Sequence, residues 1–200
     1  VLVVGVGCET VLVSELAAEV CARGRHVELL TVQGSGGSAR TIERGREVVA
    51  LLLDRAAAQR RTVVGDGVLV LGLDDPTAPF APALRRLVAR AGVRLIEPLA
   101  GSGARAHADL AVRGAQVIVS WCPPGDAPRG FAVCPVVAIA GDADELAAMP
   151  DDFDLGADGS DDAAAARILD SARAVFSGEQ SASERRGAHE FELRRLTRSM

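Results

Sequence analysis

The sequence predicts an α/β fold: a three-layer, doubly wound, mainly parallel sheet with helices on both faces, followed by a C-terminal helical arm. Short apolar runs alternate along the chain with longer segments whose apolar residues recur at helical spacing. The runs are continuous, as in Val1–Val6, which is typical of parallel strands buried on both faces. With 200 residues, of which 48% are hydrophobic, we expect one Rossmann-like domain over residues 1–176 and the arm over residues 177–200.

The first half of the chain is expected to form two strand–helix units. Leu12, Leu16 and Val20 recur on one side of the first helix, with Thr10 as its candidate N-cap and Gly24 as its stop. The other elements are two apolar runs of strand length, residues 1–6 and 27–32, and a longer amphipathic helix over residues 41–59.

The second half continues the same alternation. Four further apolar runs predict strands, at residues 68–73, 94–96, 116–120 and 136–140. Helices are expected at residues 84–91, 107–113 and 161–176, and a charged helical tail at residues 181–198. Strands and helices that alternate in this way imply right-handed crossovers and therefore a parallel sheet.

Charge and composition exclude several classes of partner. The net charge is −5 and lysine is absent, so we expect no nucleic-acid partner and no lysine chemistry such as a Schiff base. No apolar run reaches the length of about eighteen residues that a membrane span needs, so no membrane partner is expected. The four cysteines form no C-x-x-C pair and no signal peptide is recognisable, which favours a reduced, cytoplasmic protein.

A glycine-rich loop after the second strand is the strongest candidate for ligand binding. The loop leads directly into the long helix, so its backbone N–H groups and the helix N-terminus could together hold a carboxylate or phosphate. The alternative is a flexible loop that only caps the helix. The candidate substrate-binding residues are Gln33, Gly34, Ser35, Gly36, Gly37 and Ser38.

The turn after the first strand begins like a dinucleotide-binding fingerprint, Gly5-Val6-Gly7. Thr10 stands where the third glycine belongs, so the motif is weak evidence for a nucleotide-binding module. Cys8 in this turn is a candidate soft metal ligand, and its alternative role is that of a small residue packed at a tight turn.

Carboxylates gather after the sixth strand, in the stretch Met149–Asp154. Asp152 and Asp154 are candidate ligands of a divalent ion, and the alternative for both is helix capping and solvated charge. His107 is the one histidine near the edge of the sheet where ligands bind in such folds, which makes it a candidate for acid–base chemistry.

Several of these stretches together resemble the catalytic region of the altronate and galactarate dehydratases. The similar stretches follow one another in the family's order and span most of the chain: Val3–Glu9, Gln33–Ser38 with Arg40–Gly45, Gly114–Val119, Met149–Gly156 and Ser177–Ser181. The resemblance is that of a shortened and divergent member.

The resemblance implies a hydro-lyase that removes water from a sugar acid, an aldonate or aldarate, and gives a 2-keto-3-deoxy acid. It implies a divalent metal, Fe(II) or Mn(II), with Cys8, Asp152 and Asp154 as candidate ligands. Glu9 and His107 become the candidate catalytic residues, because the elimination needs a base for the proton next to the carboxylate. A small companion domain or subunit upstream and a homo-oligomer are further expectations.

The sequence departs from the family pattern at three places in the expected site. Asp74–Ala78 replaces a Cys-Gly-Gly-Ser-Asp stretch, Trp121–Gly125 replaces a Thr-Thr-Gly-Arg-Gly loop, and Ala138 stands in place of a lysine. These changes remove polar groups, which leaves a second hypothesis: a non-catalytic relative that binds an acidic metabolite or scaffolds a dehydratase subunit.

Overall fold

The computed structural model describes residues 1–9, 12–58, 68–99, 101 and 103–191. The chain divides into two compact units, residues 1–61 and 62–200. Each unit is an α/β arrangement with parallel strands, so the predicted fold class is confirmed.

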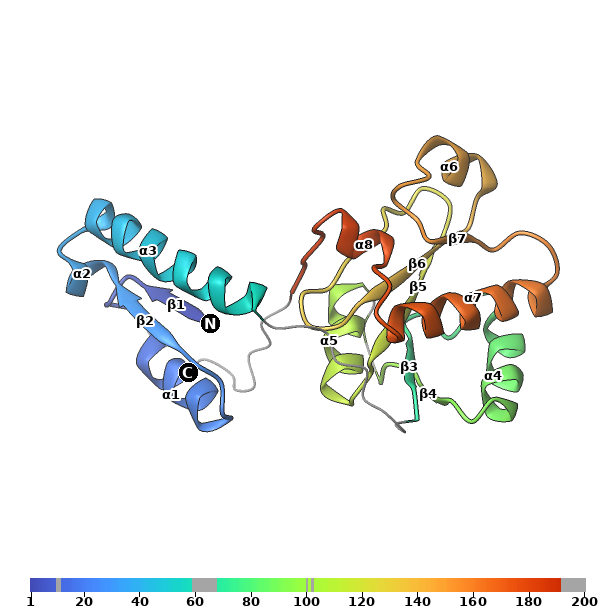
Figure 1. Cartoon of the computed structure of the whole chain (residues 1–200), viewed down its shortest axis with the longest axis horizontal. Helices are drawn as coiled ribbons and strands as arrows, with labels where there is room; N and C mark the ends of the chain where they lie inside the picture. The colour runs from blue at the N-terminus through green and yellow to red at the C-terminus, as the bar shows by residue number, and fades with distance from the viewer. Residues whose placement is uncertain (10–11, 59–67, 100, 102, 192–200) are drawn as a thin grey trace. The chain divides into compact units, whose positions relative to one another are not determined.

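The first unit is built on two parallel strands, β1 (Leu2–Gly5) and β2 (Glu28–Thr31). Helix α1 (Val13–Ala22) connects them, and Figure 1 shows α1 and the long helix α3 (Ser38–Ala57) on opposite sides of the strands. A single turn of helix, α2 (Val32–Ser35), lies between β2 and α3. The expected N-cap of α1, Thr10, lies outside the described residues.

The second unit contains a five-stranded parallel sheet in the order β4-β3-β5-β6-β7. The strands are β3 (Val70–Leu73), β4 (Arg94–Ile96), β5 (Val117–Cys122), β6 (Val136–Ala140) and β7 (Leu155–Gly156). The chain adds β4 on one side of β3 and then crosses over to add β5 on the other side. This reversal of direction places a topological switch point between β3 and β5.

Helices cover both faces of the second sheet, which makes this unit three-layered. Odd-numbered strand residues such as Leu71, Val119 and Ile139 pack into one core with α4 (Ala81–Arg90) and α7 (Asp161–Phe176). Even-numbered residues such as Ile118 and Val136 face the other way, into a smaller core that includes Leu110 of α5 (Ala104–Val112). Burial on both faces explains why these strands are continuous apolar runs.

The segment after α7 packs on the second unit instead of extending as a long helix. A four-residue helix, α8 (Ala182–Arg185), begins at a capping box formed by Ser181 and Glu184. The buried Ser183 hydroxyl donates to the Val136 carbonyl oxygen of β6 at 3.0 Å. The expected helix over residues 181–198 is thus four residues long in its described part, and residues 192–200 lie outside the described residues.

The expected strands are all present, and the way they are grouped differs from the expectation. We expected one sheet over residues 1–176, whereas the described strands form a two-stranded and a five-stranded sheet. The apolar pattern defines each strand but carries no signal about which strands become neighbours. The short elements β7 and α6 (Ala143–Ala148) were not expected. No helix in the described part of the chain is long and apolar enough to cross a membrane.

Candidate functional site

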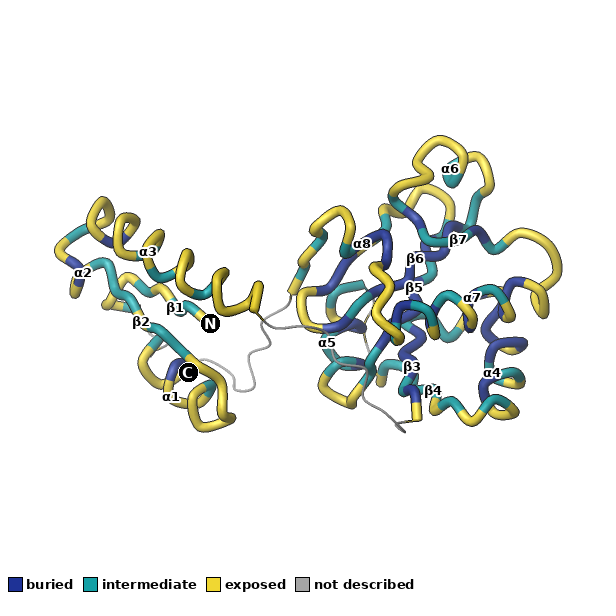
Figure 2. The backbone as a smooth tube through the Cα atoms, in the orientation of Figure 1, coloured by how far each residue is buried: buried dark blue, intermediate teal, exposed yellow. Residues whose placement is uncertain are grey.

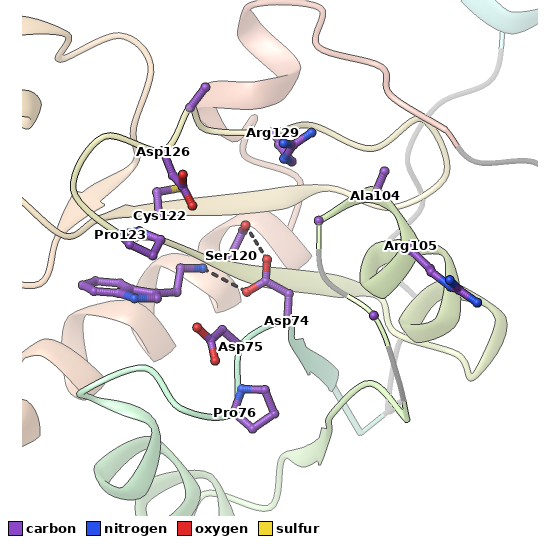
Figure 3. A pocket seen from close by; sticks show the side chains of 14 residues that line it. Asp74, Asp75, Pro76, Ala104, Arg105, Ser120, Cys122, Pro123, Asp126 and Arg129 are labelled. Carbon is purple, nitrogen blue, oxygen red and sulfur yellow. Dashed lines mark hydrogen bonds between the residues drawn. The ribbon is translucent and has the colours of Figure 1, made fainter.

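A cavity of about 530 Å³ opens in the second unit where β3 and β5 end (Figure 3). It lies at the topological switch point, the place where open parallel sheets bind their ligands. Its lining comes from the loop after β3, from the end of β5 with the loop that follows, and from the start of α5. We take this cavity, the β3–β5 crevice, as the candidate site.

Asp74, the first residue after β3, organises the floor of the crevice. Its side chain is 8% exposed, and one carboxylate oxygen accepts from the Ser120 hydroxyl at 2.5 Å and from His107 Nε2 at 3.0 Å. The other oxygen accepts from the Trp121 backbone N–H at 3.0 Å. Three donors therefore satisfy this buried carboxylate and fix its position between β3 and β5.

His107, a predicted catalytic residue, lies behind Asp74. Its side chain on α5 is fully buried, its ring is edge-on to Phe131, and it is not among the residues that line the crevice. In a serine nucleophile triad the histidine stands between serine and carboxylate, whereas here Asp74 stands between His107 and Ser120. His107 therefore positions Asp74, and the arrangement is not that of an activated serine.

Positive charge enters the crevice at the start of α5. Gly103 is the N-cap of this helix and offers no side chain, so the first-turn N–H groups are not capped by one. The Nε of Arg129 lies 3.3 Å from where a Cβ on Gly103 would be, so its guanidinium lies over this helix start. Figure 3 shows Arg105 and Arg129 on one side of the crevice and Asp75 and Asp126 on the other.

Cys122 lines the crevice, but its thiol is a poor nucleophile. Burial, followed by the negative charge of Asp74, raises the pKa of its thiol to about 12. The thiol therefore stays protonated at neutral pH, which leaves no thiolate for nucleophilic attack.

The first unit holds the other predicted catalytic residue, Glu9, and its neighbour Cys8. Backbone N–H groups, first that of Glu9 itself and then that of Gly7, lower the pKa of Glu9, and the Gly7 N–H donates to one carboxylate oxygen at 2.5 Å. The other oxygen lies 2.0 Å from where a Cβ on Gly5 would be, so the turn needs glycine at that position. Cys8 is exposed.

In the glycine-rich loop, three glycine N–H groups donate hydrogen bonds to other residues of the first unit. The Gly34 N–H donates to Thr31 Oγ1, and those of Gly36 and Gly37 donate to carbonyl oxygens of Gln33 and Val32. Gly36 and Gly37 have φ values of 82° and 116°, which a residue with a side chain rarely adopts. Ser35 is buried and Ser38 is the first residue of α3. An anion at this loop would therefore meet the start of α3, and such binding stays a prediction.

Residues 1–57, nearly all of this first unit, match the family model described as D-galactarate dehydratase/Altronate hydrolase, second domain. The match supports the family assignment over this short region. No curated protein matches the chain.

The predicted metal ligands do not fit a divalent ion of this dehydratase family. Both Asp154 oxygens accept backbone N–H groups, from Ala138 at 2.8 Å and Ala182 at 2.7 Å, and burial raises the pKa of this carboxyl. Asp152 pairs with Arg186 at 3.1 Å. Among the described residues, no group of three or more histidine, cysteine, aspartate or glutamate side chains could hold a metal. Asp152 and Asp154 thus hold the C-terminal segment through Arg186 and Ala182.

Asp74–Ala78 and Trp121–Gly125 were placed in the expected site because they replace family motifs, but no residue that lines the β3–β5 crevice was predicted to bind ligand or to act in catalysis. The position after a buried strand was the available signal, because Asp74 and Asp75 follow β3 directly. Arg129 gave no such signal, since it lies inside the proline-rich loop between β5 and β6 and not directly at the end of a strand.

Proposed function

We propose that this chain is a dehydratase-family relative that binds a small carboxylic acid in the β3–β5 crevice. One observation carries the proposal: a cavity at the carboxyl ends of two parallel strands is lined by Arg105 and Arg129, beside the start of α5, which has no side-chain cap. A guanidinium and free helix N–H groups are the donors that recognise carboxylates in proteins. A cavity of about 530 Å³ is within the range that holds a small metabolite.

A second candidate function is the hydro-lyase reaction itself, favoured by the family match over residues 1–57. In this reading the chain removes water from an aldonate or aldarate, with Fe(II) or Mn(II) and a further subunit or second copy completing the site. Its base would be Glu9, yet the backbone N–H groups that lower the Glu9 pKa make this carboxylate a weaker base. Binding without turnover therefore has the stronger support.

Calorimetry with the whole chain tests the binding proposal. We expect D-gluconate to bind, and Arg129→Gln to weaken its affinity about tenfold through loss of the cationic partner. Arg86→Gln is the matched control, because Arg86 is an exposed, acid-paired arginine of the same unit that does not line the crevice. Affinity that Arg129→Gln leaves unchanged, or that Arg86→Gln weakens equally, would overturn the proposal.

An assay for 2-keto-3-deoxy acid separates the two candidate functions. The chain is incubated with Fe²⁺ or Mn²⁺ and a panel of aldonates and aldarates. Binding with no keto acid formed supports the non-catalytic reading. Keto acid formation that Glu9→Gln abolishes would establish the hydro-lyase instead.

A further inference from the structure

The two sides of the β3–β5 crevice carry opposite charge. In Figure 3 the carboxylates of Asp75 and Asp126 lie on one side and the guanidinium of Arg129 on the other, while Arg105, also a lining residue, turns its guanidinium away from Asp74. Counting formal charges, the described lining has three aspartates against two arginines, a net charge of −1. A ligand with two carboxylates would therefore face an overall repulsive lining.

The acidic side keeps acceptor capacity for a ligand. One Asp75 oxygen accepts from the backbone N–H and hydroxyl of Thr77, at 2.8 and 2.7 Å, which holds the side chain in place. Among the described residues, the other Asp75 oxygen and the exposed Asp126 carboxylate accept no hydrogen bond. Asp74, in contrast, already accepts three hydrogen bonds.

The basic side is only partly neutralised by the protein. Arg129 pairs with Glu190 at 3.3 Å, but 52% of the arginine side chain and 42% of the glutamate side chain remain exposed. An exposed pair of this kind contributes little and leaves the guanidinium available to a ligand carboxylate. A carboxylate at this side and a cationic group at the other would satisfy both halves of the crevice.

We propose that the ligand of the β3–β5 crevice is zwitterionic: an amino acid or amino sugar acid whose carboxylate binds at Arg129 and whose ammonium group binds between Asp75 and Asp126. The proposal rests on the proposed function and narrows its substrate class. A neutral hydroxyl group could also donate to an aspartate, but an ammonium group gains the charge–charge attraction as well.

Two probes that differ in a single group test the proposal. D-Gluconate and D-glucosaminate share one carbon skeleton, and the second replaces the C2 hydroxyl with an ammonium group. We expect calorimetry on the whole chain to show D-glucosaminate binding at least tenfold more tightly. Asp126→Asn should remove most of that difference, chiefly by weakening the binding of D-glucosaminate, and Asp75→Asn should act in the same direction. Asp142→Asn is the control, since Asp142 caps α6 outside the crevice.

The outcomes separate this proposal from the one on which it rests. Equal affinity for the two probes, with both weakened by Arg129→Gln, would overturn the zwitterion proposal and keep carboxylate binding. Asp126→Asn that weakens both probes equally would overturn it too. Failure of both probes to bind would overturn both proposals. Melting curves of each variant show whether the fold is intact.

Discussion

The two units of this protein bury their residues to very different degrees (Figure 2). In the described part of the first unit the buried residues are Ala17, Ser35 and Thr41, while large apolar side chains such as Ile42 and Leu53 are exposed. In the second unit every residue of β6 is buried. The family match lies in the unit that buries little, and the candidate ligand crevice lies in the unit with the dense core. Sequence similarity and packing thus mark different parts of this molecule.

The largest effect should come from truncating a core residue of the second unit. Leu71 of β3 is fully buried in the core that the sheet forms with the helices α4 and α7. Leu71→Ala should therefore lower the free energy of unfolding by about 3 kcal/mol. Leu53→Ala in the first unit, where the side chain is 63% exposed, should change it by less than about 0.5 kcal/mol. Urea denaturation of both variants measures the contrast, and equal losses would contradict it.

A smaller loss of stability is expected from a substitution at Asp154, where the second unit holds its C-terminal segment. Asp154→Asn replaces one acceptor oxygen with an amide NH₂ that cannot accept from a backbone N–H, so we expect a loss of about 1–3 kcal/mol. Limited proteolysis should also cut the segment around residues 182–191 sooner.

The loss of unfolding free energy caused by Asp154→Asn should depend on pH. Burial raises the pKa of Asp154, so the folded protein binds this proton more tightly than the unfolded chain. The stabilisation is complete below the ordinary aspartate pKa of about 3.9 and is lost as pH rises through the folded value. The difference between wild type and Asp154→Asn should therefore shrink as pH rises. A difference that grows with pH would contradict this assignment.

Two glycine substitutions compare positions within the first unit. Gly5→Ala places a methyl group where the Glu9 carboxylate lies, so we expect a loss of about 1 kcal/mol and displacement of Glu9. Gly45→Ala in α3 meets its nearest neighbour, Leu30, at an ordinary 3.9 Å and should stabilise the helix by about 0.5–1 kcal/mol. Thermal melts of the two variants should shift in opposite directions.

Thiol reactivity gives the mildest test of the difference between the units. Cys8 and Cys21 are exposed in the first unit, whereas Cys122 and Cys134 are buried in the second, and the Cys122 pKa is about 12. Iodoacetamide at pH 8 should modify the first two in the native protein and all four after denaturation. Peptide mass spectrometry identifies the sites, and early modification of Cys122 would contradict the burial described for β5.

The sequence predicted elements better than it predicted their assembly. Continuous apolar runs define the expected strands because burial on both faces demands them, and Ser160 caps α7 where the helix was expected to start. The division into two sheets was missed, because a strand's own residues do not say which strand it pairs with. Among site residues, His107 lies near the expected edge but behind Asp74, a contact between residues 33 positions apart that no local pattern encodes. Asp152 and Asp154 look alike in sequence, and only the position of the C-terminal segment explains why neither is left for a metal.

The fastening of the C-terminal segment has a consequence for how this protein is made during translation. The Asp154 carboxylate accepts from the Ala182 N–H, and the Val136 carbonyl oxygen accepts from the Ser183 hydroxyl. The Ala132 N–H donates to the Glu190 carbonyl oxygen. These contacts cannot form until residues 182–190 have left the ribosome. Arg129, which pairs with Glu190, lies in the same late-closing region and lines the β3–β5 crevice. The crevice is therefore expected to be completed after the sheet, so a nascent chain that stops before residue 190 would have a sheet before it has a complete ligand site.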